Sequence, residues 1–477
     1  MATRARALLI AGLATLMACG CLNLGPEYQR PGVGTDVPEV YNQAVVAGEM
    51  APYSDQWWRI FGKPELDQVL EKVIASNWDI QRAAGRVLEL RAQAQVIRAD
   101  RFPELDADWR YRTEIRKIDK AGGGQSRETF RFYDLALPLF YEVDLWGRLA
   151  RAEEAARFNL LEAEENRLVV AQTVVAEAIR LYLEIESLER SIDITLQLID
   201  NFRRNARIIQ RRYERGLATA LDLRQARRIL ANAEADIPLQ RRDRANRIHQ
   251  LSVLMGAYPE IPPIRRHPED YYTRLPEVPP GLPSDLLQRR PDIRVAEARM
   301  MAQNARVGAA LADRFPRISL TGSFGYTSDS FDRLLREDSE LWSYTNGITQ
   351  PLFDYNRLEN RQRAAEGRYD QDVANYAQTV LQAFAEVEDA LQARREQLER
   401  RSRVVVLLAE ARATQDVAEK RYARGLTPYL DVLDAQRARF LAEQDMIQAD
   451  LALYLNRVNL YLALGGDWAD PGEVPPR

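Results

Sequence analysis

The chain has 477 residues, of which 29% are charged, with a formal net charge of -4 and a mean hydropathy of -0.40. The length allows a large core, but this composition is typical of extended amphipathic helices rather than of a compact enzyme. The negative charge and the lack of a basic stripe interleaved with aromatic residues argue against nucleic acid as a partner.

The first residues have the pattern of a secretory signal peptide. Arg4 and Arg6 precede an apolar run over residues 7–17, which is too short to span a bilayer. Residues 1–18 are therefore predicted to be a signal peptide, and the rest of the chain is predicted to be exported.

Both cysteines of the chain, Cys19 and Cys21, follow this signal directly. A disulfide between residues two apart has poor geometry, so one alternative is an unpaired thiol beside a cleavage site. We favour a bacterial lipoprotein, because LMAC at residues 16–19 resembles the motif in which the signal is cut and the cysteine is acylated. The frame ACGC, which would modify Cys21, is the weaker alternative. Acyl chains anchor a protein to a leaflet because each buried methylene contributes about 0.8 kcal/mol.

The chain between this cysteine and the folded part is predicted to be an extended tether. Residues 19–55 are the lipidated tether, since from Gly25 onward they are rich in proline, glycine and small residues and have no period. Trp57 and Trp58 then open the folded part. Apolar residues at helical spacing predict helix from Pro64 to Asp100.

The period changes from helical to alternating after Pro103. One face carries Leu105, Ala107, Trp109, Tyr111, Thr113 and Ile115, and the other carries Asp106, Asp108, Arg110, Arg112 and Glu114. A half-buried strand of a soluble protein is one alternative, but such charges do not suit a soluble core. About ten to twelve residues of this pattern match a transmembrane β-strand. A glycine-rich turn at 122–124 and a second strand from Thr129 to Leu137, ending at Pro138, complete a predicted hairpin at about 103–138.

A long helix is predicted from the end of Trp146-Gly147 to about Arg215. Roughly seventy residues at 1.5 Å each make about 100 Å of helix, which is longer than a globular domain requires. The chain is predicted to reverse at Gly216, because glycine takes a positive φ at little cost. A returning helix follows from Leu221 to Met255, with a kink at Pro238. The prolines of residues 261–285 predict a linker that is not helical.

The second half of the chain repeats the first. ADRFP at 99–103 recurs at 312–316, and PLF at 138–140 recurs at 351–353, both at an offset of 213; RYERGLATALD at 212–222 recurs as RYARGLTPYLD at 421–431, at an offset of 209. The two offsets differ by four residues, which are inserted in the first copy between Phe140 and Arg148, and together they predict a tandem repeat. Repeat 1 covers 56–260 and repeat 2 covers 286–466, with strands at about 316–351 and a hairpin tip at about Gly425. Residues 467–477 form a C-terminal tail.

The strand count predicts an assembly. Four strands cannot close a barrel, and an open sheet edge in hydrocarbon is prohibitive because unpaired backbone groups find no water there. A dimer would have eight strands and almost no lumen, whereas a trimer would have twelve. The predicted fold class is therefore mainly α, with two transmembrane β-hairpins per chain, a long helical α-barrel and a trimeric twelve-stranded β-barrel.

Catalysis has little support in the sequence. The only histidines are His249 and His267, and neither a mature cysteine cluster, a phosphate-binding loop nor a nucleophile elbow is present. We therefore expect no enzyme, no catalytic residue, no metal site and no cofactor. Two other classes remain open beside a passive exit duct: an anchored structural or adhesive coiled coil, and an uptake porin, which would need many more strands per chain.

Several long motifs resemble the TolC-like outer-membrane factors of tripartite efflux systems, in particular the lipoprotein branch often called NodT. The motifs are GPEYQRP, WWRIFGKPELDQVLEKVIASNWDI, YEVDLWGR, QPLFDYNRL, the two glycine hairpins and the stretch GLPSDLLQRRPDIRVAEARMMAQNARVGAALADRFPRISLTGSFGY. The resemblance covers nearly the whole mature chain. It implies a homotrimer in outer-membrane lipid that reaches through the periplasm. It also implies a periplasmic adaptor protein and an inner-membrane transporter of the RND type as partners.

The resemblance also implies roles for the two hairpin tips. The residues at which adaptor hairpins would engage are Gly216, Leu217, Ala218 and Thr219 in the first copy and Gly425, Leu426, Thr427 and Pro428 in the second. The alternative is that both tips are only turns.

A periplasmic aperture is the second implied site. Asp431 and Asp434 match aspartates of the family's constriction, and their i, i+3 spacing places both on one helix face, so that a trimer would bring six carboxylates together. Such a ring would attract cations. Asp222 of the first copy and Tyr422 are included in the predicted aperture. The alternative is that the aspartates are capping residues or dipole partners at a helix start, and for Asp222 this could be the whole role. Tyr422 matches a tyrosine of the family's closing network, but Thr427 stands where the family has its arginine partner.

Overall fold

The computed structural model describes residues 23–32, 41, 56–119, 125–263, 275 and 286–466. The predictions for the signal peptide, Cys19, Cys21, most of the tether and linker, and the C-terminal tail lie outside these residues. The chain divides into two compact units. The first contains residues 1–32, 86–164 and 295–377, and the second contains 33–85, 165–294 and 378–477.

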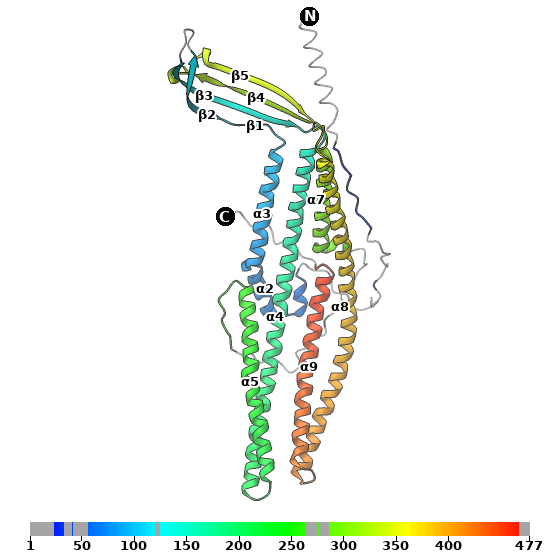
Figure 1. Ribbon diagram of the computed structural model, residues 1–477. Coiled ribbons are helices and arrows are strands. Elements are labelled where there is room, and N and C mark those ends of the chain that lie inside the picture. Colours follow the sequence, from blue (N-terminus) through cyan, green and yellow to red (C-terminus); the bar gives the residue numbers. More distant parts are fainter. Residues whose placement is uncertain are drawn as a thin grey trace. The chain divides into compact units, whose positions relative to one another are not determined.

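Six of the helices occur in three pairs of equal length (Figure 1). Helices α3 (Trp78–Ala99) and α7 (Pro291–Ala312) both have 22 residues, α4 (Arg148–Glu214) and α8 (Arg357–Ala423) both have 67, and α5 (Ala220–Leu254) and α9 (Tyr429–Ala463) both have 35. These equal lengths confirm the tandem repeat, and α4 and α8 are each about 100 Å long. Helix α5 continues through Pro238, and the kink there stays a prediction. In the described part of the chain, no helix combines the length and apolar character needed to cross a membrane.

The helix predicted from Pro64 to Asp100 is interrupted. Helix α2 (Pro64–Ser76) ends before Asn77, which has an extended ψ of 127° and precedes α3. The Asn77 side-chain oxygen accepts hydrogen bonds from the backbone N–H groups of Asp79 (2.9 Å) and Ile80 (3.1 Å), and its amide donates to the Leu254 carbonyl (2.9 Å). The apolar spacing continues across this break, so the only available signal was Asn77 itself, a favoured N-cap residue.

The strands form one antiparallel sheet. Strands β1 (Glu104–Leu105) and β2 (Asp108–Asp119) both pair with β3 (Gln125–Val143) in a single register, so they act as one interrupted strand. Strand β3 pairs in turn with β4 (Arg317–Ser328), and β4 pairs with β5 (Glu340–Thr349). The described chain therefore has four strand positions, as predicted, and the β3–β4 pairing joins the two repeats.

The register gives the sheet two chemically different faces, because directly opposite residues share a face and successive residues alternate. The apolar face includes Trp109, Tyr111, Tyr133, Leu135, Leu137, Leu139, Ile318, Leu320, Phe324, Tyr326, Trp342, Tyr344 and Ile348. The polar face includes Arg110, Arg112, Glu114, Asp134, Ser319, Thr321, Ser323, Thr327, Ser343 and Thr345. Trp342 and Ile348 are 72% and 73% exposed. So large an exposed apolar surface requires a cover, and alternation of this kind is typical of strands with one face in lipid.

The predicted end of the second strand at Pro138 was wrong, because β3 continues to Val143. Proline removes a backbone donor, which a strand tolerates only where no partner needs it. The Pro138 carbonyl accepts a hydrogen bond from the Asp106 amide (3.0 Å), at the interruption between β1 and β2. The missing N–H of Pro138 therefore falls at the gap in the neighbouring strand.

Gly325 is where β3 and β4 approach too closely for a side chain. A Cβ there would overlap the Leu135 carbonyl oxygen and lie 2.8 Å from the Ala136 Cα. We expect Gly325→Ala to open this part of the β3–β4 pairing and to raise the hydrogen-exchange rates of amides 323–327 in detergent at least about tenfold. Gly322→Ala is the matched control, since the nearest atom there is 3.8 Å away. Equal protection in the two variants would contradict this prediction.

Aromatic side chains fix the first helical turn of the second unit. Trp57, in a short 3-10 helix (Trp57–Phe61), stacks on Tyr461 of α9 with ring centroids 4.6 Å apart. Phe61 meets Tyr454 edge to face at 5.8 Å. Both tryptophans of this turn are buried, at 5% and 6% exposure. The two tryptophans begin the first helical element among the described residues, and the residues between Leu24 and Arg30 already make contacts upstream of them.

A buried ion pair holds the chain where it leaves α5. Arg244 and Glu189 are 4% and 3% exposed, and the Arg244 guanidinium donates to the Glu189 carboxylate at 2.5 and 2.8 Å. The same guanidinium donates to the backbone carbonyls of Pro262 (2.8 Å) and Pro263 (3.1 Å). One side chain therefore connects α4, α5 and the first residues of the linker.

Candidate functional site at the helix-hairpin tips

The first tip reverses α4 into α5 through a left-handed glycine. Gly216 has a φ of +72°. Its N–H donates to the Tyr213 carbonyl (2.9 Å), and the Leu217 N–H donates to the Arg212 carbonyl (2.8 Å). These two bonds are those of a Schellman motif, which satisfies the last carbonyls of a helix. The predicted turn at Gly216 is therefore confirmed.

Thr219 and Asp222 form a capping box at the start of α5. The Asp222 N–H donates to the Thr219 hydroxyl oxygen (3.2 Å), and the Thr219 N–H donates to the Asp222 carboxylate (2.9 Å). The Thr219 hydroxyl also donates to that carboxylate (2.8 Å). Asp222 thus caps a helix, which was one of the two roles considered for it, and an aperture role for it stays a prediction.

The second tip has the same turn but a different cap. Gly425 also has a φ of +72°, and the Leu426 N–H donates to the Arg421 carbonyl (3.0 Å). The N-cap of α9 is Pro428, which has no backbone N–H to offer a carboxylate and no side-chain cap. A capping box cannot form here. The Asp431 carboxylate, which occupies the position of Asp222, is therefore left without that partner.

Asp431 and Asp434 lie on one exposed face of α9. Val432, Leu433 and Ala435, which lie between and beside them in sequence, are buried. No ion pair or hydrogen bond within the described residues holds either carboxylate. The structure confirms that Asp431 and Asp434 share one face of the helix, as their i, i+3 spacing predicted. Both carboxylates are exposed and can interact with ions or other chains.

A small core joins the two hairpins beneath these aspartates. It contains Ala206, Ile209, Leu223, Ala226, Tyr429, Val432 and Leu433, with Ala218 and Tyr422 packed against it. These residues come from α4, α5, α8 and α9 and from the first tip. Because one cluster serves all four helices, displacing one hairpin must disturb the other.

Tyr422 contacts Arg212. The sequence had left the arginine partner of Tyr422 open, because Thr427 stands at the position where the family has that arginine. The Arg212 guanidinium carbon lies 4.9 Å from the Tyr422 ring centroid, and the Tyr429 ring is 5.2 Å from the same ring. Burial raises the pKa of the Tyr422 hydroxyl, and the Arg212 charge opposes that rise. Sequence reasoning missed Arg212. The available signal was the repeated RY in RYERGL and RYARGL, which supplies an arginine and a tyrosine at matching helix positions.

A polar groove of about 490 Å³ runs between α4, α8 and α9 beside the tips. Its lining includes Asn205, Arg212, Gln415, Glu419, Gln436 and Arg439. Inside it the Glu419 carboxylate accepts hydrogen bonds from the side-chain amides of Gln415 (2.7 Å) and Gln436 (3.0 Å). A groove with this lining suits a partner helix that carries polar side chains.

The two caps predict different costs of removing a threonine. Thr219→Ala deletes one half of the capping box, and we expect a loss of about 1 kcal/mol in the stability of the hairpin. Thr427→Ala is the control, because the Thr427 hydroxyl is buried without a hydrogen-bond partner and caps no helix. Urea unfolding followed by helical circular dichroism measures both variants. Equal losses would contradict the assigned caps.

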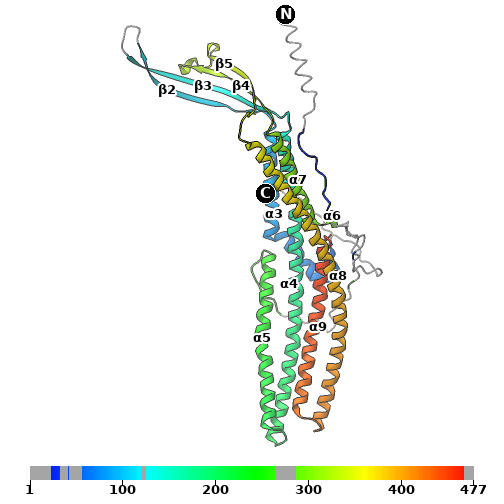
Figure 2. The same ribbon diagram turned by 45° about the vertical axis from the view of Figure 1, so that its right-hand side comes forward.

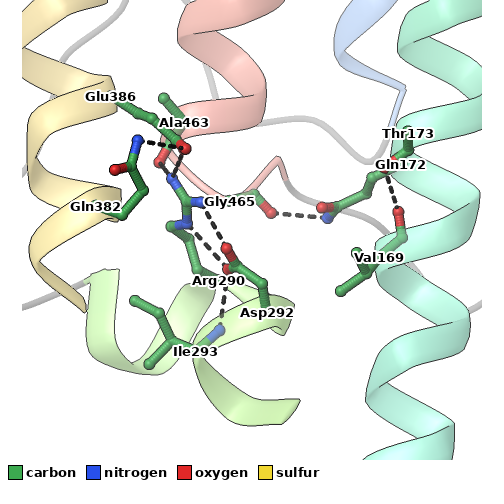
Figure 3. Close-up of polar contacts among 10 residues, drawn as sticks. All are labelled: Val169, Gln172, Thr173, Arg290, Asp292, Ile293, Gln382, Glu386, Ala463 and Gly465. Carbon is green, nitrogen blue, oxygen red and sulfur yellow. Dashed lines mark hydrogen bonds and ion pairs between the residues drawn. The ribbon is translucent and has the colours of Figure 1, made fainter. Parts of the chain in front are cut away.

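The motif that contains RRPD has a structural role (Figure 3). Arg290, 7% exposed, donates to the Asp292 carboxylate (2.6 Å), the Glu386 carboxylate (2.7 Å) and the Ala463 carbonyl (3.1 Å). Nearby, the Gln172 amide donates to the Gly465 carbonyl (2.8 Å). These bonds tie the end of α9 to α8, to α4 and to the start of α7.

The motif GPEYQRP packs against α7. Glu297, which is buried, accepts hydrogen bonds from the Tyr28 hydroxyl (2.9 Å) and from two nitrogens of Arg30 (2.7 Å each). The Asn304 side chain donates to the Pro26 carbonyl (3.0 Å). The segment just after the two cysteines is thereby held on the first unit.

Comparison with known proteins agrees with this architecture. The outer membrane efflux protein family matches residues 69–257 and 282–466. Outer membrane protein OprJ of Pseudomonas aeruginosa is 33% identical over 462 residues, which cover 96% of each chain. "Probable outer membrane lipoprotein SilC" of Salmonella typhimurium is 31% identical over 456 residues, 94% of this chain and 96% of its own. The solved outer-membrane channel OprN has a TM-score of 0.84 at 30% identity, covering 94% of this chain and 99% of that one.

These matches and the fold define a class. The chain is an outer-membrane efflux channel, built from two copies of a helical repeat that each carry a β-hairpin. It belongs to the outer membrane efflux protein family.

Proposed function

We propose that three copies of this chain form one closed conduit, which passively conducts substrates from a periplasmic adaptor and an inner-membrane transporter to the outside. The observation that carries this proposal is the sheet. Within the described residues, β2 and β5 each pair on one side only, and the apolar face is exposed. Open edges cannot persist in hydrocarbon, so other copies must pair with them.

The number three follows from the size of the lumen. Two chains would supply eight strands, whose interior is filled by side chains, whereas three would supply twelve and leave a passage. With the apolar face towards lipid, the polar face would line the passage with arginine, carboxylate and hydroxyl groups. The energy for transport would come from the inner-membrane partner, and the proposal assigns no catalytic step, metal or cofactor to this chain.

The hairpin tips are the proposed docking sites for the adaptor. Gly216 to Thr219 and Gly425 to Pro428 form short turns in which Leu217 and Leu426 are 65% and 62% exposed. The polar groove beside them supports the same role, because it can accept a helix along α4 and α8. We infer an inner-membrane transporter of the RND type as the third component.

Asp431 and Asp434 are the proposed aperture. Three copies would bring six exposed carboxylates together at the narrow end of the helical tube, where they would attract cations. Tyr422, in contact with Arg212 and Tyr429, would hold the two hairpins of each copy together beneath that ring. Asp222 would contribute by fixing the first tip rather than by lining the passage.

Cys19 is the proposed site of lipidation, with Cys21 as the alternative. The docked segment supports this, because the Leu24 N–H donates to the Trp146 carbonyl (3.2 Å), close to the end of β3 and the start of α4. An acyl chain three to five residues away would enter lipid beside the periplasmic ends of the strands. The name of SilC as a lipoprotein is consistent with this proposal.

Planar-bilayer recording of the purified full chain tests the proposed function. A constricted duct predicts small, discrete openings. An anchored coiled-coil rod would give no openings, and an uptake porin would give large openings from a single chain. Either of these two results would contradict the proposal.

A further inference from the structure

We propose that Lys117, Arg127 and Arg131 form a binding site for the phosphate groups of an outer-leaflet glycolipid. These three side chains are called the basic patch below. The proposal rests on the proposed function in one respect, namely that the apolar face of the sheet meets lipid.

The patch lies on a two-stranded ribbon that extends beyond the rest of the sheet. Strand β3 pairs with β4 from Tyr133 to Val143, whereas Gln125 to Phe132 pair with β2 alone. Figure 2 shows β2 and β3 continuing past the ends of β4 and β5. Eight residues at about 3.4 Å each carry the ribbon roughly 25 Å past the four-strand region.

Aromatic rings mark the level at which this ribbon begins. On the apolar face Tyr133 packs on Tyr111 at 4.9 Å between ring centroids, and Phe331 meets both Trp109 and Tyr133 at 5.9 Å. Aromatic girdles of this kind sit at the membrane–water interface of transmembrane barrels. The ribbon therefore starts where the lipid headgroups start.

The register sorts the charges of the ribbon between its faces. Lys117 lies opposite Arg127, and Arg131 lies opposite Thr113, all on the continuation of the apolar face and all three cations exposed. The carboxylates of Glu114 and Glu128 lie on the polar face. Among the side chains that the structure describes, the charged ones on this face of the ribbon are therefore all cations.

The cations of the polar face differ because they are already paired. Arg112 and Arg116 bind the Glu114 carboxylate at 3.1 and 2.5 Å. Their guanidinium groups also lie over Phe132 and Phe130, at 4.7 and 5.5 Å from the ring centroids. No carboxylate of the described residues holds Lys117, Arg127 or Arg131 in this way.

Phosphate is the ligand that suits this arrangement. Arginine binds phosphate oxygens with two parallel N–H donors, and lysine adds a compact charge. Lys117 and Arg127 are cross-strand neighbours, and Arg131 is four residues, or about 13 Å, further along β3. A glycolipid with a phosphate at each end of a disaccharide could reach both positions while its acyl chains cover the apolar face.

Lipid binding to the detergent-solubilised full chain, measured by native mass spectrometry, tests the site. The probe is a bisphosphorylated disaccharide glycolipid, compared with the same lipid after phosphate removal. We expect the phosphorylated lipid to bind at least about tenfold more tightly. The variant K117Q/R127Q/R131Q should lose that preference, and Arg131→Gln alone should weaken binding about threefold. Equal binding of the two lipids to the wild type, or an unchanged preference in the triple variant, would overturn the proposal.

The matched control is R110Q/R112Q/R116Q, which removes three cations from the polar face of β2. It should retain the lipid preference, and an equal loss in this control would also overturn the assignment. Conductance separates this proposal from the proposed function, because the basic-patch variant should still form channels. A protein that binds the glycolipid but never conducts would contradict the conduit and leave the lipid site standing.

Discussion

Replacing both Asp431 and Asp434 by asparagine is expected to raise the single-channel conductance about threefold and to weaken block by Ca²⁺ at least about tenfold. The physical reason is that six uncompensated carboxylates at a constriction hold cations in the passage. Both aspartates are exposed, and Pro428 denies Asp431 the capping contact that Asp222 has. Planar-bilayer recording at several Ca²⁺ concentrations measures both effects.

Asp222→Asn is the control for this experiment, since Asp222 occupies the matching position of the other tip. Its carboxylate is engaged by Thr219, so its neutralisation should leave conductance and Ca²⁺ block close to those of the wild type. If D222N changes the block as strongly as D431N/D434N, the two tips are equivalent and the assignment of the aperture to the second copy is wrong.

Arg244→Ala is expected to reduce the stability of the helical unit by about 3–5 kcal/mol. The substitution removes the two hydrogen bonds that the Arg244 guanidinium donates to the Glu189 carboxylate, which is 3% exposed, and the two that it donates to the Pro262 and Pro263 carbonyls. Losing charge-assisted hydrogen bonds at a buried carboxylate is far more costly than losing them at an exposed one. A lower urea midpoint of helical circular dichroism, and faster proteolysis at residues 262–263, would report the loss.

Arg242→Ala provides the comparison from two residues away on the same helix. Arg242 pairs with Asp243, and both side chains are exposed, at 63% and 47%. Exposed ion pairs contribute at most about 1 kcal/mol, so this variant should unfold near the wild-type midpoint. Similar midpoints for the two variants would mean that the Arg244 contacts do not stabilise the unit.

The features that sequence predicted best are those set by local periodicity. The long helices begin and end within about two residues of the predicted limits, because Gly147, Gly216 and Gly425 each take a positive φ at a helix boundary. The two faces of the sheet were also predictable from alternation alone. Asn77 and Pro138 were not, because their conformations depend on partners distant in sequence, namely the Leu254 carbonyl and the interruption between β1 and β2.

The features of the candidate site also separate into those that local sequence predicted and those that required the fold. The shared face of Asp431 and Asp434 follows from helical spacing, and the difference between Thr219 and Pro428 as N-caps is visible in the aligned repeats. The Arg212–Tyr422 contact joins two residues 210 positions apart, so the repeated RY supplies the two residue types but only the fold shows that they meet. The groove beside the tips depends on how α4, α8 and α9 pack, and it too required the fold.

The mass of the detergent-extracted, channel-forming protein tests the central claim most directly, because the sheet of one chain has two open edges. Native mass spectrometry at the concentrations used for conductance should give a species of three chains, each near the 54.6 kDa of the sequence after correction for the removed signal and the added lipid. Conductance from a species of one or two chains would contradict a barrel that three chains share.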